Sequence, residues 1–340
     1  MKYFVLGYFG FDNLGDELLL KQTIQIIHKV DPDCEITSLS YSQTNTEDLH
    51  GIHAVSRNDF MGLFETMFKS DVVIGGGGSI LQNVTSNRSI IYYITILLCA
   101  KAMRKKVVMM GNGIGPIKGA FYQKATSYLL RKVDLFLARD EDTMDEVVNR
   151  GAKNPVLAAD LVYYGYQKKN KQKSKTVLIN IRPWHLDERF HSSMKSFLKK
   201  IEEKGYNIAL VSMQKGHDDI ELKKLGDYTF LDVTMQNYLN SDAEYYCMIG
   251  MRLHALIWAG IRDTPFLSIS YDPKIDSFTK ISGQINAGPV HKINENLLLS
   301  NFETLEIEYE ERERALKQAN QRISQLALEN EKQLKRLIEQ

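Results

Sequence analysis

The first half of the chain alternates short apolar runs with amphipathic segments, and glycine-rich turns follow several of the apolar runs. Strands are predicted at 3–9, 35–39, 71–74, 107–110 and 135–138, and helices at about 16–30, 89–103, 121–132 and 141–150. Strand, turn and helix in repeated order produce βαβ crossovers. The pattern therefore predicts a parallel sheet with helices on both faces.

A polar, lysine-rich stretch, Gln167–Lys175, interrupts this alternation and has the composition of an exposed linker. The pattern then restarts, with predicted strands at 176–181, 207–211, 248–250 and 265–269 and helices at 188–204 and 252–259. A chain of 340 residues is long for one core and suits two domains. We expect an α/β fold with two Rossmann-like domains, 1–166 and 167–300.

The last segment, 301–340, has a different pattern. Its apolar residues recur at helical spacing among many charges, at Leu316, Ala319, Ile323, Leu326, Leu334 and Leu337. This spacing predicts one or two amphipathic helices. Two placements remain open from the sequence: an outer helix that covers one domain, or a helix that crosses back to contact both.

Composition excludes several classes of protein. The formal net charge of +1 gives no global basic field, so we expect no nucleic-acid partner. The three cysteines, Cys34, Cys99 and Cys247, are far apart and odd in number, which argues against a disulfide framework or a cysteine-rich zinc site. The N-terminus lacks the pattern of a signal peptide. We expect a cytoplasmic protein.

The longest apolar run, Ile90–Ala100, is about half of what a bilayer span needs. Lys101, Arg104, Lys105 and Lys106 follow it. We favour a buried helix with a solvated basic end. The alternative is a peripheral contact of Ile90–Lys106 with the inner face of the cell membrane, where an apolar face and cations meet anionic lipid.

The loop after the first predicted strand has glycines at 7, 10 and 15, which does not fit the dinucleotide fingerprint. It does place N–H groups at a helix start, at the carboxyl edge of the sheet, where ligands bind in open α/β sheets. The polar or small residues that it brings to this edge are Asn13, Gly15, Asp16 and Glu17. A simple helix cap by Asp16 is an equal alternative.

Two further glycine-rich segments follow strands. Four successive glycines, Gly75–Gly78, let a ligand approach the backbone, and we predict that Gly76, Gly77 and Gly78 line the binding site. A tight turn is the alternative. Asn112 lies in a similar segment after the next strand, and Arg139 ends another strand, followed by Asp140 as an expected helix cap.

The second half carries the stronger signals. Pro183 ends a strand ladder, so Arg182 is expected at the sheet edge. Arg252 and His254 fall in the first turn of a helix that follows a strand, where N–H groups and the helix dipole favour an anion. A guanidinium matches phosphate or carboxylate, and an imidazole transfers protons near neutral pH. Lys274, after the next strand, is a further candidate cation.

The chain resembles the polysaccharide pyruvyl transferases, because the motifs DNLGDE at 12–17, GGGGS at 75–79, GNGIGP at 111–116, ARD at 138–140, IRPW at 181–184 and GMRLHA at 250–255 occur in that family's order and spacing. The likeness covers residues 1 to about 295 and is nearest to the CsaB-type, cell-wall branch. It implies a GT-B-like fold, with two Rossmann-like domains facing each other across a cleft.

The resemblance also implies an activity: transfer of pyruvate from phosphoenolpyruvate (PEP) onto two hydroxyls of a sugar as a ketal, with release of phosphate. In the CsaB-type branch the sugar is N-acetylmannosamine of a secondary cell-wall polymer, with hydroxyls 4 and 6 as the family expectation. S-layer homology domains recognise this ketal. Whether the acceptor is lipid-linked stays open.

The family's residues map onto this chain by position. Its Arg-Leu-His motif falls on Arg252, Leu253 and His254, and a further PEP-binding arginine falls on Arg182. Asn13, Asp16 and Glu17 match the N-terminal motif.

Our mechanistic hypothesis gives His254 the acid–base role and makes Asp16 or Glu17 the base that activates the sugar hydroxyl. It needs no metal and no cofactor, since PEP is a substrate. The alternatives are a GT-B glycosyltransferase that uses a nucleotide sugar, and a binding protein without activity.

Overall fold

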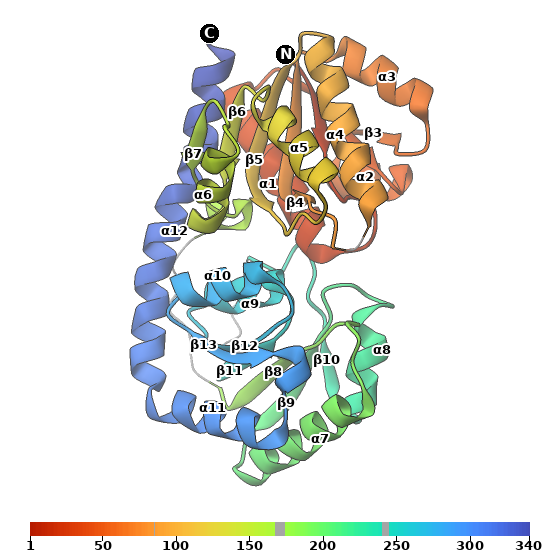
Figure 1. The fold of residues 1–340 in the computed structure, drawn as a ribbon. Coiled ribbons are helices and arrows are strands. Elements are labelled where there is room, and N and C mark those ends of the chain that lie inside the picture. Colours follow the sequence, from red (N-terminus) through yellow and green to blue (C-terminus); the bar gives the residue numbers. More distant parts are fainter. Residues whose placement is uncertain (85, 167–173, 240–244) are drawn as a thin grey trace. The chain divides into compact units, whose positions relative to one another are not determined.

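The computed structural model describes residues 1–84, 86–166, 174–239 and 245–340. Most of the predicted linker, Gln167–Lys175, lies outside the described residues. The chain divides into two compact units: unit 1 comprises Met1–Gly165 and Ile323–Gln340, and unit 2 comprises Tyr166–Arg322 (Figure 1). Each unit is built on a parallel sheet, so the predicted class of two α/β domains is confirmed.

Unit 1 has a seven-stranded sheet of order β3-β2-β1-β4-β5-β6-β7, in which neighbouring strands pair in parallel. The direction of strand order reverses between β1 and β4. Its elements are β1 (Lys2–Leu6), α1 (Leu14–Val30), β2 (Glu35–Ser40), α2 (Gln43–His50), β3 (His53–Ser56), α3 (Phe60–Lys69), β4 (Val72–Leu81), α4 (Asn87–Ala102), β5 (Lys106–Ile114), α5 (Ala120–Leu130), β6 (Leu135–Ala138), α6 (Glu141–Asn149), β7 (Pro155–Leu157) and η1 (Leu161–Gly165).

The core of unit 1 explains the apolar runs of the sequence. One continuous hydrophobic cluster includes residues of α3, α4, α5 and α6 packed on the sheet. Ile90, Ile94 and Leu97 of α4 are buried in it, so the expected buried helix at 90–100 is confirmed. Burial removes this apolar surface from water and is the main driving force that holds the layer of helices on the sheet.

Unit 2 has a six-stranded parallel sheet of order β10-β9-β8-β11-β12-β13. Here the order reverses between β8 and β11. Its elements are β8 (Thr176–Asn180), α7 (Glu188–Glu203), β9 (Asn207–Val211), α8 (Asp218–Leu222), η2 (Lys223–Leu225), β10 (Thr229–Leu231), β11 (Cys247–Gly250), α9 (Leu253–Gly260), β12 (Phe266–Ser270), α10 (Pro273–Ile281), β13 (Ile285–Pro289), η3 (Val290–Lys292) and α11 (Glu295–Ile307).

The C-terminal segment 301–340 contains the end of α11 and one long helix, α12 (Tyr309–Ile338), which belongs to both units. In unit 2, Asn320 donates to the carbonyl of Gly260 at 2.7 Å. In unit 1, Asn330 donates to the carbonyl of Ala159 at 3.3 Å and Tyr164 donates to Glu331 at 2.6 Å. Of the two placements that the sequence left open, the helix that contacts both units is the one observed.

The glycine-rich segments of unit 1 differ from the expectation of loops, because they continue the strands. β4 runs through Gly75–Gly78 to Leu81, and β5 runs on to Ile114. Gly77 has φ +80°, and a Cβ there would lie 3.0 Å from Leu19 and 3.2 Å from Leu161. The glycines therefore let α1 and η1 pack closely on an irregular stretch of the sheet.

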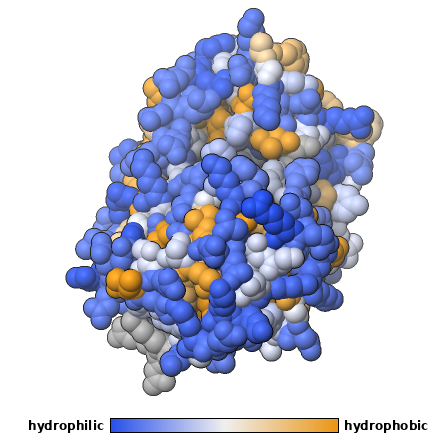
Figure 2. All heavy atoms as spheres, turned by 60° about the horizontal axis from the view of Figure 1, so that its bottom comes forward, coloured by the Kyte–Doolittle hydropathy of each residue, from blue (hydrophilic) through white to orange (hydrophobic). Residues whose placement is uncertain are grey.

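The described surface is mostly hydrophilic in the view of Figure 2, with hydrophobic side chains in small patches. Among the described helices, none combines the length and the hydropathy that a transmembrane span requires. Cys34, Cys99 and Cys247 are free cysteines.

Candidate active site

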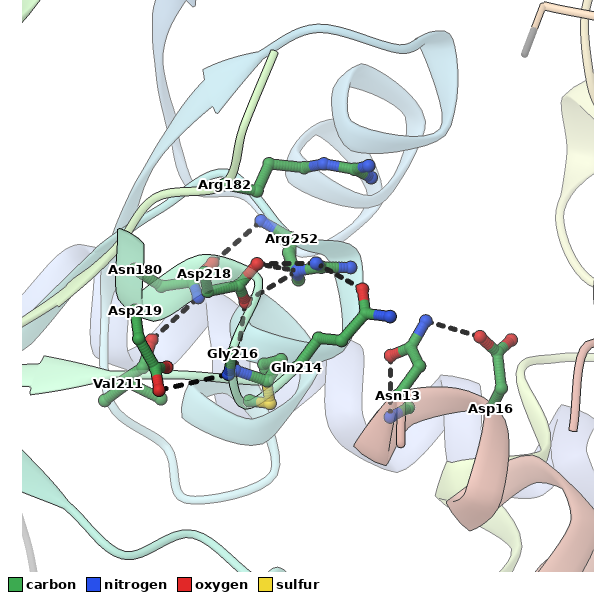
Figure 3. Close-up of polar contacts among 12 residues, drawn as sticks. Asn13, Asp16, Asn180, Arg182, Val211, Gln214, Gly216, Asp218, Asp219 and Arg252 are labelled. Carbon is green, nitrogen blue, oxygen red and sulfur yellow. Dashed lines mark hydrogen bonds and ion pairs between the residues drawn. The ribbon is translucent and has the colours of Figure 1, made fainter. Parts of the chain in front are cut away.

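The candidate residues of unit 2 lie around the point where its strand order reverses. Arg182 follows β8 and Arg252 follows β11, and these two strands are neighbours on either side of that point. Ligands of open parallel sheets bind outside the carboxyl ends of the strands at such a point. In Figure 3 the two arginine side chains extend in the same direction. The fold therefore brings together two arginines that are 70 residues apart in sequence.

Asn180, the last residue of β8, holds the neighbouring strand ends in place. It is fully buried, and its Nδ2 donates to the carbonyl of Val211 at 2.8 Å while its Oδ1 accepts from the N–H of Arg252 at 3.0 Å (Figure 3). Buried side chains with both polar ends bonded fix their surroundings, because breaking either bond leaves a group without water. Asn180 thus positions the backbone from which Arg252 extends.

Arg252 is less available than the sequence suggests. Its side chain is buried, and its Nε and Nη2 form a two-pronged ion pair with Asp218, which is fully buried. Nη2 also donates to Oε1 of Gln214 at 2.9 Å (Figure 3). Among the described residues, Nη1 makes no hydrogen bond. A ligand can therefore accept a hydrogen bond from Nη1 of Arg252. The positive charge of this arginine is already paired with the carboxylate of Asp218.

Arg182 has a different environment. Its Nη1 donates to the hydroxyl of Tyr271 at 3.0 Å, and its guanidinium lies 5.0 Å from the centre of the Tyr271 ring and 5.5 Å from that of Trp184. In the described part of the chain no carboxylate forms an ion pair with it, and its buried Nε has no hydrogen-bond partner. A half-buried cation without a counter-charge favours binding of an anion.

The pKa of the Tyr271 hydroxyl is lowered by the cations around it. Burial by itself raises the pKa of its hydroxyl, but Lys274, Arg182 and Arg252 outweigh that effect and hold the pKa below its ordinary value. Lys274, in the first turn of α10, lies 3.7 Å from Asp272 and 5.8 Å from the centre of the Tyr271 ring. Two predicted cations, Arg182 and Lys274, therefore lie against the Tyr271 ring, and Arg252 adds to the positive field at its hydroxyl.

The start of α9 adds N–H donors. Arg252 is its N-cap residue, and no side chain of the described residues caps the helix. His254 is half-buried in the first turn, and its carbonyl accepts a 2.6 Å bond from the Tyr238 hydroxyl. The side chain of Leu253 is buried in the core, so only its backbone is available to a ligand. The helix start and its dipole add to the attraction for an anion.

A pocket of about 460 Å³ lies beside this cation group. Trp184 and Tyr271, which contact Arg182, form part of its wall, and Asp272, Asp276, His185 and His291 supply its charged and titratable side chains. The backbone of His185 has φ +48°, an uncommon conformation for a residue with a Cβ. The two carboxylates make this pocket a poor site for an anion.

In unit 1, α1 begins at Leu14, two residues before the predicted start at about residue 16. Asn13, and not Asp16, is the N-cap: its Oδ1 accepts from the N–H of the buried Gly15 at 3.3 Å. Its Nδ2 also donates to the carboxylate of Asp16 (Figure 3). The alternative in which Asp16 only caps its helix is therefore wrong, and Asp16 has a half-buried carboxylate at the carboxyl edge of the sheet.

Glu17 is held on both sides. It is buried, one oxygen accepts from the N–H of Gly10 at 2.8 Å, and the other lies 2.9 Å from Nε2 of His50. A carboxylate whose two oxygens are both engaged supports the shape of the loop. Of the two candidate bases, the structure leaves Asp16 as the more accessible one.

Two other predicted residues of unit 1, Gly78 and Arg139, have contacts with Asp16 and with Ser79, respectively. A Cβ on Gly78 would lie 3.6 Å from Oδ1 of Asp16, which places that glycine beneath the carboxylate. Arg139 lies 3.5 Å from the hydroxyl of Ser79 and 3.0 Å from Asp140, which caps α6 as expected.

The other predicted residues have packing roles. Gly76 and Gly77 are buried against α1 and do not line an open surface. Asn112 is fully buried and donates to the carbonyls of Gly77 and Gly78 at 2.7 and 3.3 Å. It fastens the irregular part of β4 to β5. Among the described residues, no group of three or more histidine, cysteine, aspartate or glutamate side chains is placed to hold a metal ion.

Sequence reasoning missed Asn180, Gln214, Asp218 and Tyr271. Gln214 and Asp218 follow β9 in a polar segment, MQKGHDD, that starts two residues after the end of a predicted strand. Polar residues after a buried strand lie at the carboxyl edge of a parallel sheet. That position was the signal that could have found them. The bond between Arg252 and Asp218 joins segments 34 residues apart and was not visible in the pattern.

A stack of three aromatic rings was also not anticipated. Tyr8 and Phe11 lie face to face with ring centres 3.9 Å apart, and Phe11 stacks on Tyr41 at 4.5 Å. Tyr8 and Tyr41 are exposed. Tyr8 and Phe11 belong to the loop that precedes α1, and Tyr41 follows β2, so the stack presents an aromatic surface of the kind that contacts ligands.

The fold and the site together define a two-domain α/β protein of the GT-B-like class. Similar folds occur in UDP-GlcNAc 2-epimerase from Neisseria meningitidis bound to UDP-GlcNAc (TM-score 0.65, 12% identity, 100% of both chains), in S. aureus MnaA in its UDP co-structure (0.62, 12%, 94% of this chain and 91% of that one) and in a glycosyltransferase from Rickettsia africae (0.60, 11%, 99% and 98%). At these identities the likeness shows the fold alone.

The family follows from a different comparison. The family model for polysaccharide pyruvyl transferase matches residues 13–273, which is more than half of the chain, and the chain belongs to this family. The match includes Asn13, Arg182, Arg252 and His254. A search of curated proteins found no match. Membership indicates an enzyme that transfers pyruvyl groups to polysaccharide.

Proposed function

We propose that this enzyme takes the pyruvyl group from PEP and attaches it to a sugar as a ketal, with release of phosphate. The observation that carries the proposal is the placement of Arg182 and Arg252 after the neighbouring strands β8 and β11, with Arg182 and Lys274 against the ring of Tyr271 and the uncapped start of α9 beside them. PEP carries about three negative charges near neutral pH. A small ligand of that charge needs several cations and oriented N–H donors, and this part of unit 2 offers both.

The two arginines are proposed to play different roles. Arg182, which has no carboxylate partner among the described residues, supplies the net positive charge for the phosphate or carboxylate of PEP. Arg252 presents Nη1 from a rigid position, because Asp218 and Asn180 fix its side chain and backbone. A pre-oriented donor stabilises charge in the transition state without having to reorganise. The neighbouring pocket, with its two aspartates, is not the proposed PEP site.

The proposed reaction conserves atoms and protons. An acid protonates C3 of PEP and leaves a cationic centre at C2, to which one sugar hydroxyl adds. The bond from C2 to the phosphate oxygen then breaks, and the second hydroxyl closes the ketal. The two hydroxyls lose two protons, of which one replaces the proton given to C3 and the other leaves with phosphate. The scheme uses no metal and no cofactor.

His254 is the proposed acid, since it lies in the first turn of α9 beside Arg252. Asp16 is the proposed base, in preference to Glu17, whose oxygens are both engaged. Tyr8, in the loop between β1 and α1, and Tyr41, after β2, are exposed and stack on Phe11, and we propose that they contact the acceptor sugar. Asn13, Ser79 and Arg139 supply further hydrogen-bonding groups at that edge.

For the acceptor we propose N-acetylmannosamine of a cell-wall polysaccharide precursor, joined through hydroxyls 4 and 6, as in the CsaB-type branch. The ketal would then serve in S-layer anchoring. The precursor would be modified in the cytoplasm, either free or linked to a lipid. These details rest on the motif resemblance described above.

The test is phosphorus NMR of the enzyme with PEP and a synthetic lipid acceptor that carries N-acetylmannosamine. We expect PEP to be consumed and inorganic phosphate to appear only when the acceptor is present. Arg182→Ala and His254→Ala should each lower the rate by at least about a hundredfold, as loss of a transition-state contact or of an acid–base group does. Arg189→Ala, an exposed arginine of α7, is the matched control and should retain the rate. Phosphate release unaffected by Arg182→Ala would refute the site.

The rival function is a glycosyltransferase that uses a nucleotide sugar. It shares the fold with the solved structures named above, two of which contain UDP or a UDP sugar. A ligand that binds only the folded protein raises its melting temperature. PEP is expected to raise it and UDP-GlcNAc is not, and the reverse result would favour the rival.

A further inference from the structure

The exposed side of α3, α4 and α5 has an unusual combination of charge and hydrophobicity. Between Asp71 and Asp134 the sequence contains no aspartate and no glutamate over 62 residues, whereas the average of the whole chain would give about eight. The same stretch has nine cations: Arg88, Lys101, Arg104, Lys105, Lys106, Lys118, Lys124, Arg131 and Lys132. A protein of net charge +1 therefore concentrates positive charge on two neighbouring helices and their loops.

Large apolar side chains are exposed on the same layer. On α3, Phe60, Met61, Phe64 and Phe68 are 64, 84, 45 and 71% exposed. Phe60, Phe64 and Phe68 recur every fourth residue, so they form a single stripe along the helix. On α5, Phe121 and Tyr128 are 68 and 50% exposed, and on α4 Ile91 is 43% exposed. Exposed apolar side chains grouped in this way mark an interaction surface.

These three helices are neighbours. They share one hydrophobic cluster on the same face of the sheet, and α4 packs against α5 (Figure 1). Tyr92 of α4 donates to the carbonyl of Arg57, just before α3, and Lys105, just after α4, donates to the carbonyl of Phe68 and lies over its ring. The apolar stripe of α3 therefore runs beside the basic end of α4.

Most of these cations are available to a partner. Arg88, Arg104, Lys118, Lys124, Arg131 and Lys132 are exposed, whereas Lys101 pairs with Asp134. The only carboxylate within α3 is that of Glu65, which pairs with Lys69. The surface ends at α6, whose exposed residues include Glu141, Asp142 and Asp145.

We infer that the outer face of α3, α4 and α5 docks the enzyme on a membrane that contains anionic lipid, with the aromatic side chains of α3 and α5 in the headgroup region and the lysines and arginines on the phosphates. An apolar helix face with flanking cations binds such surfaces by burying apolar area and by electrostatic attraction. Exposing four large apolar side chains of one short helix to water is unfavourable unless a partner covers them. This surface differs from the buried face of the 90–100 run, and the inference does not depend on the proposed reaction.

The experiment is co-sedimentation of the full chain with vesicles of phosphatidylglycerol and phosphatidylcholine, and with vesicles of phosphatidylcholine alone. We expect binding to the anionic vesicles, weaker binding as salt is raised, and little binding to the neutral ones. Phe60→Ser/Phe68→Ser should weaken binding about tenfold or more. Lys124→Gln/Lys132→Gln should weaken it about twenty-five-fold, at about fivefold for each cation.

Matched controls lie on unit 2. Ile307→Ser removes an apolar side chain that is 85% exposed, and Lys195→Gln/Lys199→Gln removes two exposed lysines of α7. Both should bind like the unaltered protein, and all variants should keep its melting temperature, because every replaced side chain is exposed. Absence of binding to anionic vesicles overturns the inference. An equal loss of vesicle binding in the test and control variants also overturns it. So does a Phe60→Ser/Phe68→Ser variant that binds vesicles normally but changes its oligomeric state.

Discussion

Replacing Arg252 with alanine would leave the carboxylate of Asp218 without its counter-charge in a place that water does not reach. Asp218 is fully buried, and Nε and Nη2 of Arg252 meet both of its oxygens. Removing one partner of a buried ion pair costs about 3–5 kcal/mol. For a unit of this size that corresponds to a fall in melting temperature of roughly 6–20 °C. The variant should therefore lose stability as well as PEP turnover.

A double variant, Arg252→Ala/Asp218→Asn, separates the loss of stability from the loss of PEP turnover. In Arg252→Ala/Asp218→Asn the buried charge is gone, while the asparagine oxygen can still accept from the N–H of Met213, which now donates to Asp218 at 3.0 Å. Urea unfolding should show the double variant to be more stable than Arg252→Ala, although neither should turn over PEP. Arg189→Ala, which removes an exposed arginine, should change the free energy of unfolding by less than about 0.5 kcal/mol. The argument fails if Arg252→Ala unfolds at the urea concentration of the unaltered protein.

Two further predictions concern single groups. Because the cations lower the pKa of Tyr271, one tyrosine should ionise before the others in an ultraviolet titration, and Tyr271→Phe should abolish that early step. Because the folded state favours the ionised phenolate, Tyr271 contributes its full stabilisation at pH values above the pKa of an unfolded tyrosine. This stabilisation is lost as the pH falls through the lowered pKa of the folded state. Arg182→Met should bring the folded and unfolded pKa values of Tyr271 closer together. In unit 1, Asp16→Asn should reduce kcat with little change in stability. Glu17→Gln should lower the free energy of unfolding by about 1–3 kcal/mol, because it disturbs the bonds to Gly10 and His50. If urea unfolding shows the loss of stability in Asp16→Asn and kinetics show the loss of kcat in Glu17→Gln, the two roles are exchanged.

The sequence was informative where one element follows another. The strands at 176–181, 207–211, 248–250 and 265–269 were predicted closely, because each is a short apolar run bounded by polar or glycine residues. Short strands with weak patterns, such as β3, β7 and β10, were missed, and so was α3. The glycine segments were placed correctly but were read as loops, since a run of glycines resembles a turn unless its neighbours are known.

The sequence alone determined the class of fold and the family, because alternating patterns and ordered motifs are local properties of the chain. It also predicted Arg182, Arg252 and His254 as site residues, because Arg182 and Arg252 come just after strands and His254 lies in the first turn of the helix that follows Arg252. Only the tertiary structure decided how these residues differ. Among the described residues, Asp218 pairs with Arg252, whereas Arg182 contacts Tyr271 and Trp184 and has no carboxylate partner. Both oxygens of Glu17 are engaged, and Asp16 is more accessible. Charge pairing and burial depend on which segments meet in space, and residues far apart in the chain do not reveal that in their pattern.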